Sequence, residues 1–305
     1  ASFDDPPPVA PEQRIRGRWA WPRSCMITIL LILSACAAHG VSFVPARLGA
    51  RGHAGRSHAH RMGASANSGD AASAASSTRT TPPPATAAKT CALVEALAAE
   101  LRFKASERQT QYWIGIAGGP GTGKTTLAHA LCTALGSDLA IVLPMDGFHY
   151  TKAELDVFPD PTLAYARRGA PFTFNATKFA VRLGALHAAG DGTWPSFDHA
   201  VGDPVDDDLV LEQKHRIVIV EGNYLLLDEP FWREARQHFD ETLFVLVEET
   251  VARDRVATRN AKAWGWPLEC AYARVDTNDL INMRLIAATE QFATRVINGD
   301  DIKLF

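Results

Sequence analysis

Residues 113–126 read WIGIAGGPGTGKTT, an apolar run that leads directly into glycines and ends in a lysine and two threonines. Within it, residues 118–125 fit the pattern of glycine, four variable residues, glycine, lysine, and serine or threonine. Glycines at these positions let backbone N–H groups turn inward around phosphate oxygens, and the helix that follows presents its positive amino-terminal end. A strand-like run before the motif and a helical pattern after it favour a phosphate-binding loop over a flexible glycine-rich linker.

Each polar side chain of this loop has an expected role. Lys124 would neutralise the β- and γ-phosphates of ATP, which makes it a predicted catalytic residue, and the Thr125 hydroxyl is suited to Mg²⁺. ATP and Mg²⁺ are therefore the expected cofactors. The predicted ATP-binding residues are Gly118, Gly119, Gly121, Thr122, Gly123, Lys124, Thr125 and Thr126.

Predicted strands and helices alternate on both sides of the loop. Apolar residues recur at helical spacing over 93–101, 127–135, 179–186 and 250–259, and helical content continues over 279–297. Short apolar or β-branched runs predict strands at 113–117, 140–143, 216–220 and 242–247. This alternation implies a parallel sheet with helices on both faces. The expected fold class is therefore α/β, a P-loop NTPase three-layer sandwich with a mostly parallel sheet.

Two acidic residues follow predicted strands where a nucleotide site would lie. Asp146 comes just after the second strand and Glu221 just after the third. The carboxyl ends of parallel strands face the same crevice as the phosphate-binding loop. Asp146 could accept the proton of an acceptor hydroxyl, and Glu221 could hold Mg²⁺ or polarise a water near the γ-phosphate. The alternatives are a turn role for Asp146 ahead of Gly147 and a helix-capping role for Glu221.

Three arginines, Arg253, Arg255 and Arg259, lie on the predicted helix after the fourth strand. Their spacing places Arg255 and Arg259 on one face, from which they could close over ATP and stabilise charge on the transferring phosphoryl group. Arg255 is the predicted catalytic arginine. A solvated helix surface explains the same run of charge.

Composition divides the chain, which has 305 residues, is 47% hydrophobic and carries a net charge of −3. Residues 1–89 carry a net charge of +6, and residues 90–305 carry −9. An acidic body argues against nucleic-acid binding, because phosphate backbones are held by clustered lysine and arginine. The five cysteines are scattered without metal-ligand spacing, which is typical of reduced thiols. Residues 90–305 are therefore expected to form one kinase-sized domain.

Residues 1–89 are predicted to be a disordered targeting leader. Residues 26–38 read MITILLILSACAA, which is short for a membrane span but has the length of a signal-peptide hydrophobic region. Residues 41–89 are basic, poor in acids and rich in alanine and serine, as transit peptides are. Such a pair resembles the bipartite leader of plastids bounded by extra membranes, so a plastid location is expected. A secreted or cytoplasmic protein is the alternative, and Met26 is a candidate start.

Further motifs resemble one known family. They read MDGFH at 145–149, RRGAPFTF at 167–174, PSFDH at 195–199, VEGNYLL at 220–226 and RVDTNDL at 274–280. Together with the phosphate-binding loop they make most of residues 110–290 similar to the phosphoribulokinase/uridine kinase group of P-loop kinases, which includes type I pantothenate kinase. The resemblance implies that Asp146 is the catalytic base, that the acceptor binds at 167–174 and 197–199, and that a lid lies at 253–259. The residues after Asp146 follow the pantothenate kinase style rather than that of phosphoribulokinase itself.

The predicted function is ATP-dependent transfer of the γ-phosphoryl group to a hydroxyl of a small metabolite, such as a sugar, a nucleoside, pantothenate or a glycerate-like acid. Arg168, Asp198 and His199 are the predicted acceptor-binding residues, although a lone histidine is often only packed or exposed. The alternative is a nucleotide-hydrolysing P-loop switch without an acceptor, against which the long polar segment 165–199 argues. The expected partner is a small hydroxylated substrate, with no nucleic acid and, after leader removal, no stable membrane anchor. A homodimer is one possible assembly.

Overall fold

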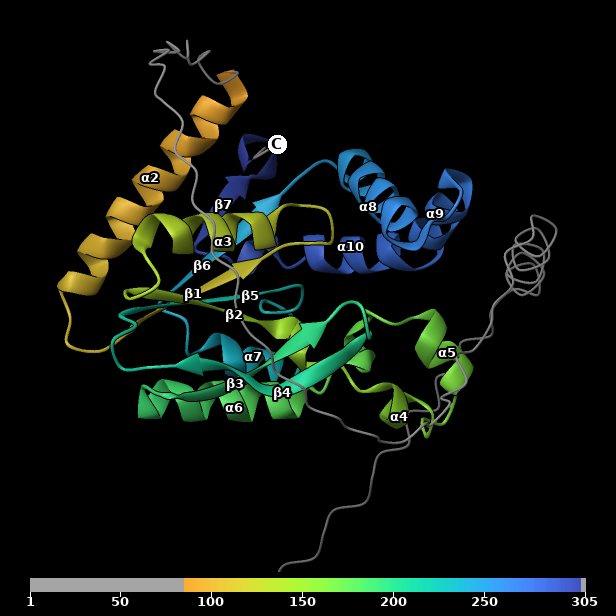
Figure 1. Ribbon diagram of the computed structural model, residues 1–305, viewed down its shortest axis with the longest axis horizontal. Helices are drawn as coiled ribbons and strands as arrows, with labels where there is room; N and C mark the ends of the chain where they lie inside the picture. Colours follow the sequence, from red (N-terminus) through yellow and green to blue (C-terminus); the bar gives the residue numbers. More distant parts are fainter. Residues whose placement is uncertain (1–84, 303–305) are drawn as a thin grey trace, which may run out of the picture. The chain divides into compact units, whose positions relative to one another are not determined.

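A five-stranded parallel sheet forms the centre of the computed structural model, which describes residues 85–302, with side chains described from residue 92. The strand order is β2-β5-β1-β6-β7, and every pairing in the sheet is parallel (Figure 1). The strands are β1 (Tyr112–Ala117), β2 (Ala140–Pro144), β5 (Ile217–Gly222), β6 (Glu241–Leu246) and β7 (Arg295–Asn298). The predicted α/β class and parallel sheet are therefore confirmed.

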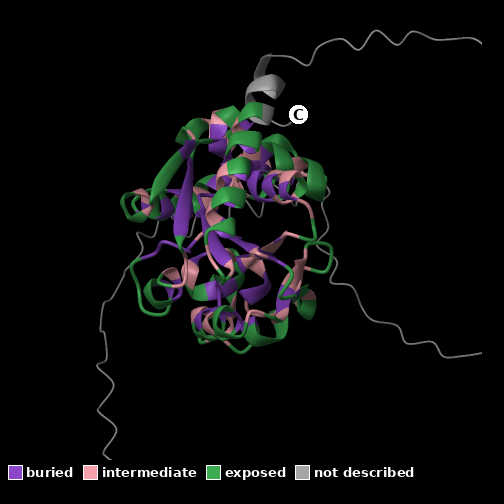
Figure 2. Cartoon of the chain, turned by 90° about the vertical axis from the view of Figure 1, so that its left-hand side faces the viewer, coloured by how far each residue is buried: buried purple, intermediate pink, exposed green. Residues whose placement is uncertain are grey.

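Helices cover both faces of this sheet (Figure 1). One face packs against α2 (Ala85–Ser106) and α3 (Lys124–Leu135), and the other against α6 (Ala176–Ala189) and α7 (Trp232–Arg236). Along β5 the side chains alternate: Ile217 and Ile219 join the first layer, whereas Val218 and Val220 join the second. Because both faces are buried, the strand reads as a continuous apolar run. Figure 2 shows the buried strands between helices whose outer faces are exposed.

Local sequence signals explain where several helices begin and end. Asn175 caps α6 by accepting a hydrogen bond of 2.8 Å from the Lys178 N–H, and Gly190 ends it with a φ of +78°. Thr151 forms a capping box with Glu154 at the start of the short helix α4. The short elements between β2 and α6 are η1 (Met145–Phe148), α4 (Lys152–Leu155), α5 (Pro161–Ala166) and η2 (Pro171–Thr173).

An antiparallel hairpin, which the sequence reading did not predict, lies between α6 and β5. It consists of β3 (Gly192–Asp198) and β4 (Asp203–Leu211), and Trp194 anchors it by donating its indole N–H to the Pro144 carbonyl at 2.8 Å. The segment 165–199 is therefore not one long polar connection, since it contains α6 and β3.

The carboxyl-terminal part of the chain forms a group of helices with its own small apolar core and then returns to the sheet. Its elements are α8 (Glu249–Trp264), α9 (Leu268–Arg274), the π-helical turn η3 (Val275–Asp279), α10 (Leu280–Ala287), η4 (Glu290–Phe292) and η5 (Gly299–Ile302). The expectation of helix through residue 297 is wrong, because residues 295–298 form edge strand β7 beside β6. Two β-branched residues, Val296 and Ile297, favour the strand, and Ile297 is buried in the core.

The predicted leader falls almost entirely outside the described residues, which begin at Ala85. Its signal-like and transit-like segments therefore stay predictions, and helix α2, which begins at Ala85, crosses the predicted boundary at residue 89. Within the described range, no helix combines the length and apolar character needed to cross a bilayer.

Candidate active site

The predicted phosphate-binding loop connects β1 to α3. Gly121 has a φ of +81°, and a Cβ there would lie 2.5 Å from the Ala252 carbonyl oxygen, so only glycine fits. Gly123, with a φ of +96°, stands at the start of α3, and no described side chain caps the helix there. The first N–H groups of α3 are therefore left for a ligand, which is the arrangement that binds phosphate.

Thr125 and Glu221 meet at the carboxyl edge of the sheet. The Thr125 hydroxyl donates to Glu221 Oε2 at 3.2 Å, and the carboxylate is only 5% exposed. Burial raises the pKa of Glu221, the Lys124 ammonium opposes that shift, and the charge of Asp146 adds to it. The four polar side chains that sequence reasoning assigned to nucleotide, metal and base roles therefore share one edge of the sheet.

The donor set of this edge fits Mg²⁺. Thr125 and Glu221 offer oxygen atoms, and no cluster of three or more His, Cys, Asp or Glu side chains in the described range forms a metal site. Mg²⁺ characteristically takes one or two protein oxygens together with substrate phosphates and waters. The glutamate is already joined to the hydroxyl of the loop, so a capping role is not needed to explain it.

Asp146 lies in η1, directly after β2, and is half-buried. Its backbone carbonyl accepts hydrogen bonds from the His149 N–H at 3.1 Å and from His149 Nδ1 at 2.9 Å, which form the turn. The carboxylate makes no hydrogen bond to a described residue, so the turn does not use it. Asp146 is therefore left with a carboxylate available to a ligand.

The turn around Asp146 is packed tightly against the hairpin. A Cβ at Gly147 would lie 2.2 Å from the Pro195 carbonyl oxygen. The His149 ring contacts Phe174 and Phe197, tilted by 37° and 44°, with ring centroids 3.8 Å and 4.8 Å away. Burial lowers the pKa of His149, while the Asp146 charge opposes that shift. Aromatic side chains therefore form one wall beside the carboxylate.

Two of the three predicted acceptor-binding residues lie beside this wall. Arg168 donates to the Tyr150 carbonyl at 3.0 Å and to Asp203 Oδ1 at 3.3 Å, and its guanidinium lies over the Phe197 ring. His199 is exposed and meets the edge of the same ring. Their role in binding stays a prediction.

Asp198, the third predicted acceptor-binding residue, uses its carboxylate in hydrogen bonds to the backbone. Its carboxylate accepts backbone N–H bonds from Ala200 at 2.7 Å and Val201 at 3.1 Å. These bonds form the turn between β3 and β4, and acceptor contact by Asp198 stays a prediction.

The three arginines of α8 have different surroundings. Arg255 donates to the Gly121 carbonyl at 3.3 Å and pairs with Asp300 at 3.0 Å, so it reaches the phosphate-binding loop. Arg253 forms a two-bond ion pair with Asp276 at 2.6 and 2.8 Å. Arg259 is exposed. The contacts are thus compatible with Arg255, rather than Arg253, as the arginine nearest the nucleotide.

The last described turn, η5, packs against the phosphate-binding loop. A Cβ at Gly299 would lie 2.5 Å from the Thr122 carbonyl oxygen, and Ile302 approaches Gly123. Asp300 pairs with Arg255, as described above. The loop is therefore held between α8 and the carboxyl-terminal turn.

Asn278, Asn282 and Tyr224, which sequence reasoning gave no role, join the predicted acceptor segment to the carboxyl-terminal helices and to the end of β5. Arg167 donates to Asn282 Oδ1 at 3.1 Å, and Asn278 donates to the Arg168 carbonyl at 3.0 Å. The Tyr224 hydroxyl donates to the Gly169 carbonyl at 2.5 Å. All but Asn282 stand inside the motifs quoted for the family resemblance, which was the available signal.

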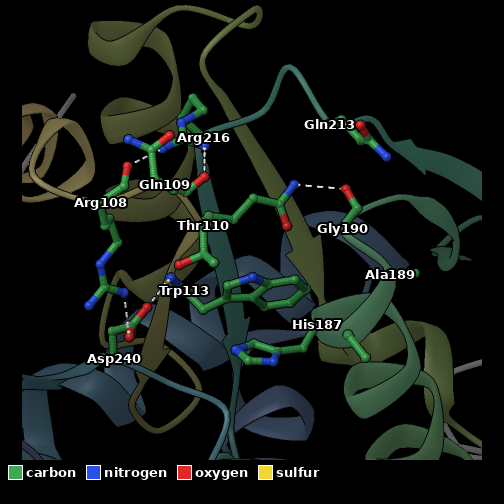
Figure 3. Close-up of a pocket in the computed structure, with 12 residues that line it drawn as sticks. Arg108, Gln109, Thr110, Trp113, His187, Ala189, Gly190, Gln213, Arg216 and Asp240 are labelled. Atoms are coloured by element: carbon green, nitrogen blue, oxygen red, sulfur yellow. Dashed lines mark hydrogen bonds and ion pairs between the residues drawn. The ribbon is translucent and has the colours of Figure 1, made fainter.

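A cavity of about 620 Å³ lies at the opposite, amino-terminal edge of the sheet (Figure 3). Its cations are occupied: Arg108 pairs with Asp240 at 2.6 Å, and Arg216 donates to the Gln109 carbonyl at 2.6 Å. The cavity has no phosphate-binding loop and no free acid beside it. It is therefore separate from the candidate site.

A phosphate-binding loop at the carboxyl edge of a parallel sheet, with Glu221 and Asp146 at neighbouring strand ends, defines a nucleotide-binding protein of the P-loop kinase class. No family model matches the sequence. The chain is 46% identical over 187 residues to the "Putative uridine kinase" of Schizosaccharomyces pombe, a match that covers 59% of this chain and 80% of that protein. The ATP-dependent kinase YFH7 of Kluyveromyces lactis is 34% identical over 189 residues, covering 49% and 54% of the two chains.

One solved structure extends this likeness to the fold. The crystal structure of a "putative fructose transport system kinase" from Silicibacter sp. TM1040 superposes with a TM-score of 0.60 and 31% identity. It covers 67% of this chain and 98% of that one. The chain belongs to the phosphoribulokinase/uridine kinase family of P-loop kinases, as its motifs predicted.

Proposed function

We propose that the protein is an ATP-dependent kinase that transfers the γ-phosphoryl group to a hydroxyl of a small metabolite. The observation that carries this proposal is the presence, at one sheet edge, of a phosphate-binding loop, a buried glutamate bonded to it and an aspartate with an unused carboxylate. Relatives that are named as kinases support the phosphotransfer. A hydroxyl acceptor is the chemistry that a free carboxylate at this place would serve.

The nucleotide end of the reaction would use the loop and its lysine. Backbone N–H groups at the start of α3 bind the phosphates, and Lys124 holds negative charge on the β- and γ-oxygens. Thr125 and Glu221 would hold Mg²⁺, which, when bound, neutralises charge on the phosphate oxygens. Arg255, bonded to the Gly121 carbonyl, lies where a cation can approach the same phosphates.

The acceptor end of the reaction would use Asp146. Its carboxylate accepts the proton of the acceptor hydroxyl while that oxygen forms a bond to the γ-phosphorus. The bond between the γ-phosphorus and the β–γ bridging oxygen breaks, and ADP leaves with that oxygen. The aromatic wall of Phe174, His149 and Phe197 would limit access of water to the carboxylate.

The alternative function is nucleotide hydrolysis that drives a conformational change, without an acceptor. The kinase is favoured because residues 167–169, which begin the predicted acceptor segment, are bonded to Asn282 of α10 and to Tyr224, and a switch does not need such a segment. The test is ADP release by the full chain with a panel of sugars, nucleosides, glycerate and pantothenate, with product mass determined. Acceptor-dependent ADP release with a product heavier by one phosphoryl group is expected. ADP release that no acceptor stimulates would contradict the kinase.

The cellular location is a separate proposal, which rests on the composition of residues 1–89. We propose import into a plastid bounded by extra membranes. A fluorescent protein fused after residues 26–89 should enter that plastid when it is expressed in an alga of this kind. Retention in the cytosol would contradict the proposal.

A further inference from the structure

Arg274, at the end of α9, carries a guanidinium nitrogen with nothing to bind. Its Nη1 is buried and has no hydrogen-bond partner among the described residues. Burial lowers the pKa of Arg274, and the charge of Asp279 opposes that shift. An unpaired donor on a buried cation is costly, and such groups normally find a partner. The described residues therefore provide no acceptor for Arg274 Nη1, and a bound ligand could supply one.

Arg167 adds a second cation to the same place. Its side-chain hydrogen bonds go to neutral oxygens, Asn282 Oδ1 and the Thr277 carbonyl, at 3.1 and 3.2 Å. Burial lowers its pKa as well. Burial raises the pKa of the Asp279 carboxyl group, and the charges of Arg274, Arg259 and Arg167 oppose that shift, so several cations act on this one carboxylate. Arg167 and Arg274 are called here the arginine pair. Together with Asp279 they carry an excess of positive charge.

Other unpartnered atoms lie in residues 167–169 and in the two segments that are hydrogen-bonded to them. The described part of the chain has five buried side-chain nitrogen or oxygen atoms without a hydrogen-bond partner, and four belong to these segments. They are Arg168 Nε, Asn223 Oδ1, Arg274 Nη1 and Asn278 Oδ1. Asn278 lies in η3, where a π-helical turn interrupts the helix, and such turns are frequent at functional sites. Donors and acceptors are thus both left open, as a ligand with an anion and hydroxyl groups would require.

Contacts link this place to the predicted acceptor segment rather than to the phosphate-binding loop. Arg255 already reaches the phosphate-binding loop through the Gly121 carbonyl. Arg167 instead begins the segment 167–169, whose Arg168 and Gly169 carbonyls accept hydrogen bonds from Asn278 and Tyr224. Burial raises the pKa of Tyr224, Arg167 opposes the shift, and the charges of Asp279 and Asp146 add to it. Tyr224 therefore lies within electrostatic reach of both the arginine pair and the predicted base.

We infer that the acceptor carries an anionic group, a carboxylate or a phosphate, which Arg274 and Arg167 bind while a hydroxyl of the same molecule meets Asp146. This inference rests on the proposed kinase function and narrows its substrate class to charged hydroxylated metabolites. Bidentate recognition by guanidinium groups suits either anion. Neutral nucleosides and free sugars can accept a hydrogen bond from Arg274, but they bring no negative charge to balance the two guanidinium groups.

The first test compares acceptors that differ only in charge. ADP release by the full chain is measured with glycerate against glycerol, pantothenate against its alcohol, and sugar phosphates against the parent sugars. For any pair in which the enzyme phosphorylates at least one member, we expect kcat/KM to be about tenfold or more higher for the charged member. The reason is that only the charged member brings a negative charge to its hydrogen bonds with the arginine pair. Equal or better turnover of the neutral member would overturn the inference and leave the kinase standing.

The second test removes the cation. Arg274→Gln should raise the KM for the charged acceptor about tenfold while the KM for ATP and the turnover of a neutral acceptor stay unchanged. Arg274→Lys, which keeps the charge, should recover part of the loss. Arg284→Gln is the matched control, because Arg284 pairs with Glu249 on the surface. A raised KM for ATP alone would assign the guanidinium to the γ-phosphate and overturn the inference.

A binding measurement covers the case in which no acceptor is phosphorylated, which would refute the kinase. The loop is filled with a non-hydrolysable β,γ-imido analogue of ATP, and inorganic phosphate is titrated by calorimetry. Binding about tenfold weaker in Arg274→Gln than in the unmodified chain would retain the anion site. Equal binding in both would overturn it.

Discussion

Thr125 Oγ1 donates a hydrogen bond of 3.2 Å to Glu221 Oε2, joining residues 96 positions apart. The bond ties the first turn of α3 to the end of β5, whose last residues pair with β1 and whose Glu221 stands opposite Pro144 of β2. The bond therefore connects the phosphate-binding loop to the strand that precedes Tyr224.

Replacement of Glu221 by glutamine should weaken metal use. The amide can still accept the Thr125 hydroxyl, but it lacks the charge that Mg²⁺ and Lys124 require. We expect the Mg²⁺ concentration for half-maximal activity to rise about tenfold. The measurement is ADP release across a Mg²⁺ titration, with exposed Glu234→Gln on α7 as the control. An unchanged Mg²⁺ dependence would show that Glu221 does not hold the metal.

Removal of the loop cation should abolish most of the activity. Lys124→Ala loses the ammonium that neutralises transferring charge, so turnover should fall by about 100-fold or more. Lys178→Ala is the control, since Lys178 pairs with the exposed Asp206 far from the loop. Turnover within a few-fold of the unmodified protein would remove Lys124 from the mechanism.

Asp146→Asn should separate binding from chemistry. The amide keeps the shape of the side chain but cannot take a proton, so kcat should fall by about 10² to 10⁴. ATP affinity, measured by calorimetry, should be retained because the loop is unchanged. Asp206→Asn, at an exposed position of β4, should be neutral. Near-normal phosphorylation by Asp146→Asn would exclude the base assignment.

Gly147→Ala should damage both stability and activity. Its Cβ would lie 2.2 Å from the Pro195 carbonyl, so the turn that carries Asp146 has to move away from β3. We expect a loss of about 1–3 kcal/mol in the free energy of unfolding. Gly184→Ala is the matched control: its Cβ meets only the end of the His238 side chain, and helix propensity favours alanine there. Equal stability of the two variants would contradict the packing argument.

The stability of the protein should depend on pH through His149. Burial lowers the pKa of His149 below its ordinary 6.5, while Asp146 opposes the shift and Arg168 and His199 add to it. The unfolded chain then binds the proton more readily, so the stabilisation is complete above pH 6.5 and is lost as pH falls towards the folded-state pKa. Denaturant unfolding from pH 7 to 5 should show a smaller fall in His149→Gln than in the unmodified protein. Identical profiles would show that His149 does not contribute to the pH dependence. His215 and His238, whose pKa values burial also lowers, are present in both proteins and so cannot cause a difference between them.

Strong local patterns predicted the central part of the fold. The loop 118–125 needs glycine at particular positions for steric reasons, and β5 is apolar throughout because it is buried on both faces. Both patterns can therefore be recognised in the sequence without knowledge of the tertiary structure. The strand ends then fixed where Glu221 and Asp146 would lie, since parallel strands share one carboxyl edge.

The missed elements depend on partners distant in the chain. The edge strand β7 buries chiefly Ile297, and its pairing with β6 overrides a local pattern that reads as helix. The hairpin β3–β4 has a polar outer strand, Asp203–Leu211, which carries little hydrophobic alternation. Arg274 could not be separated from other charged residues because its significance lies in a missing partner, which only the packed structure reveals.

The packing of η5 against the phosphate-binding loop has a consequence for how the protein is made. Gly299 and Asp300 are among the last described residues to be translated, yet Gly299 packs against Thr122 and Asp300 pairs with Arg255. A growing chain that still holds these residues inside the ribosome has no complete nucleotide site. ATP can therefore stabilise the domain only after synthesis has passed this turn, and a chain that ends before Gly299 should bind nucleotide weakly even where its sheet has formed.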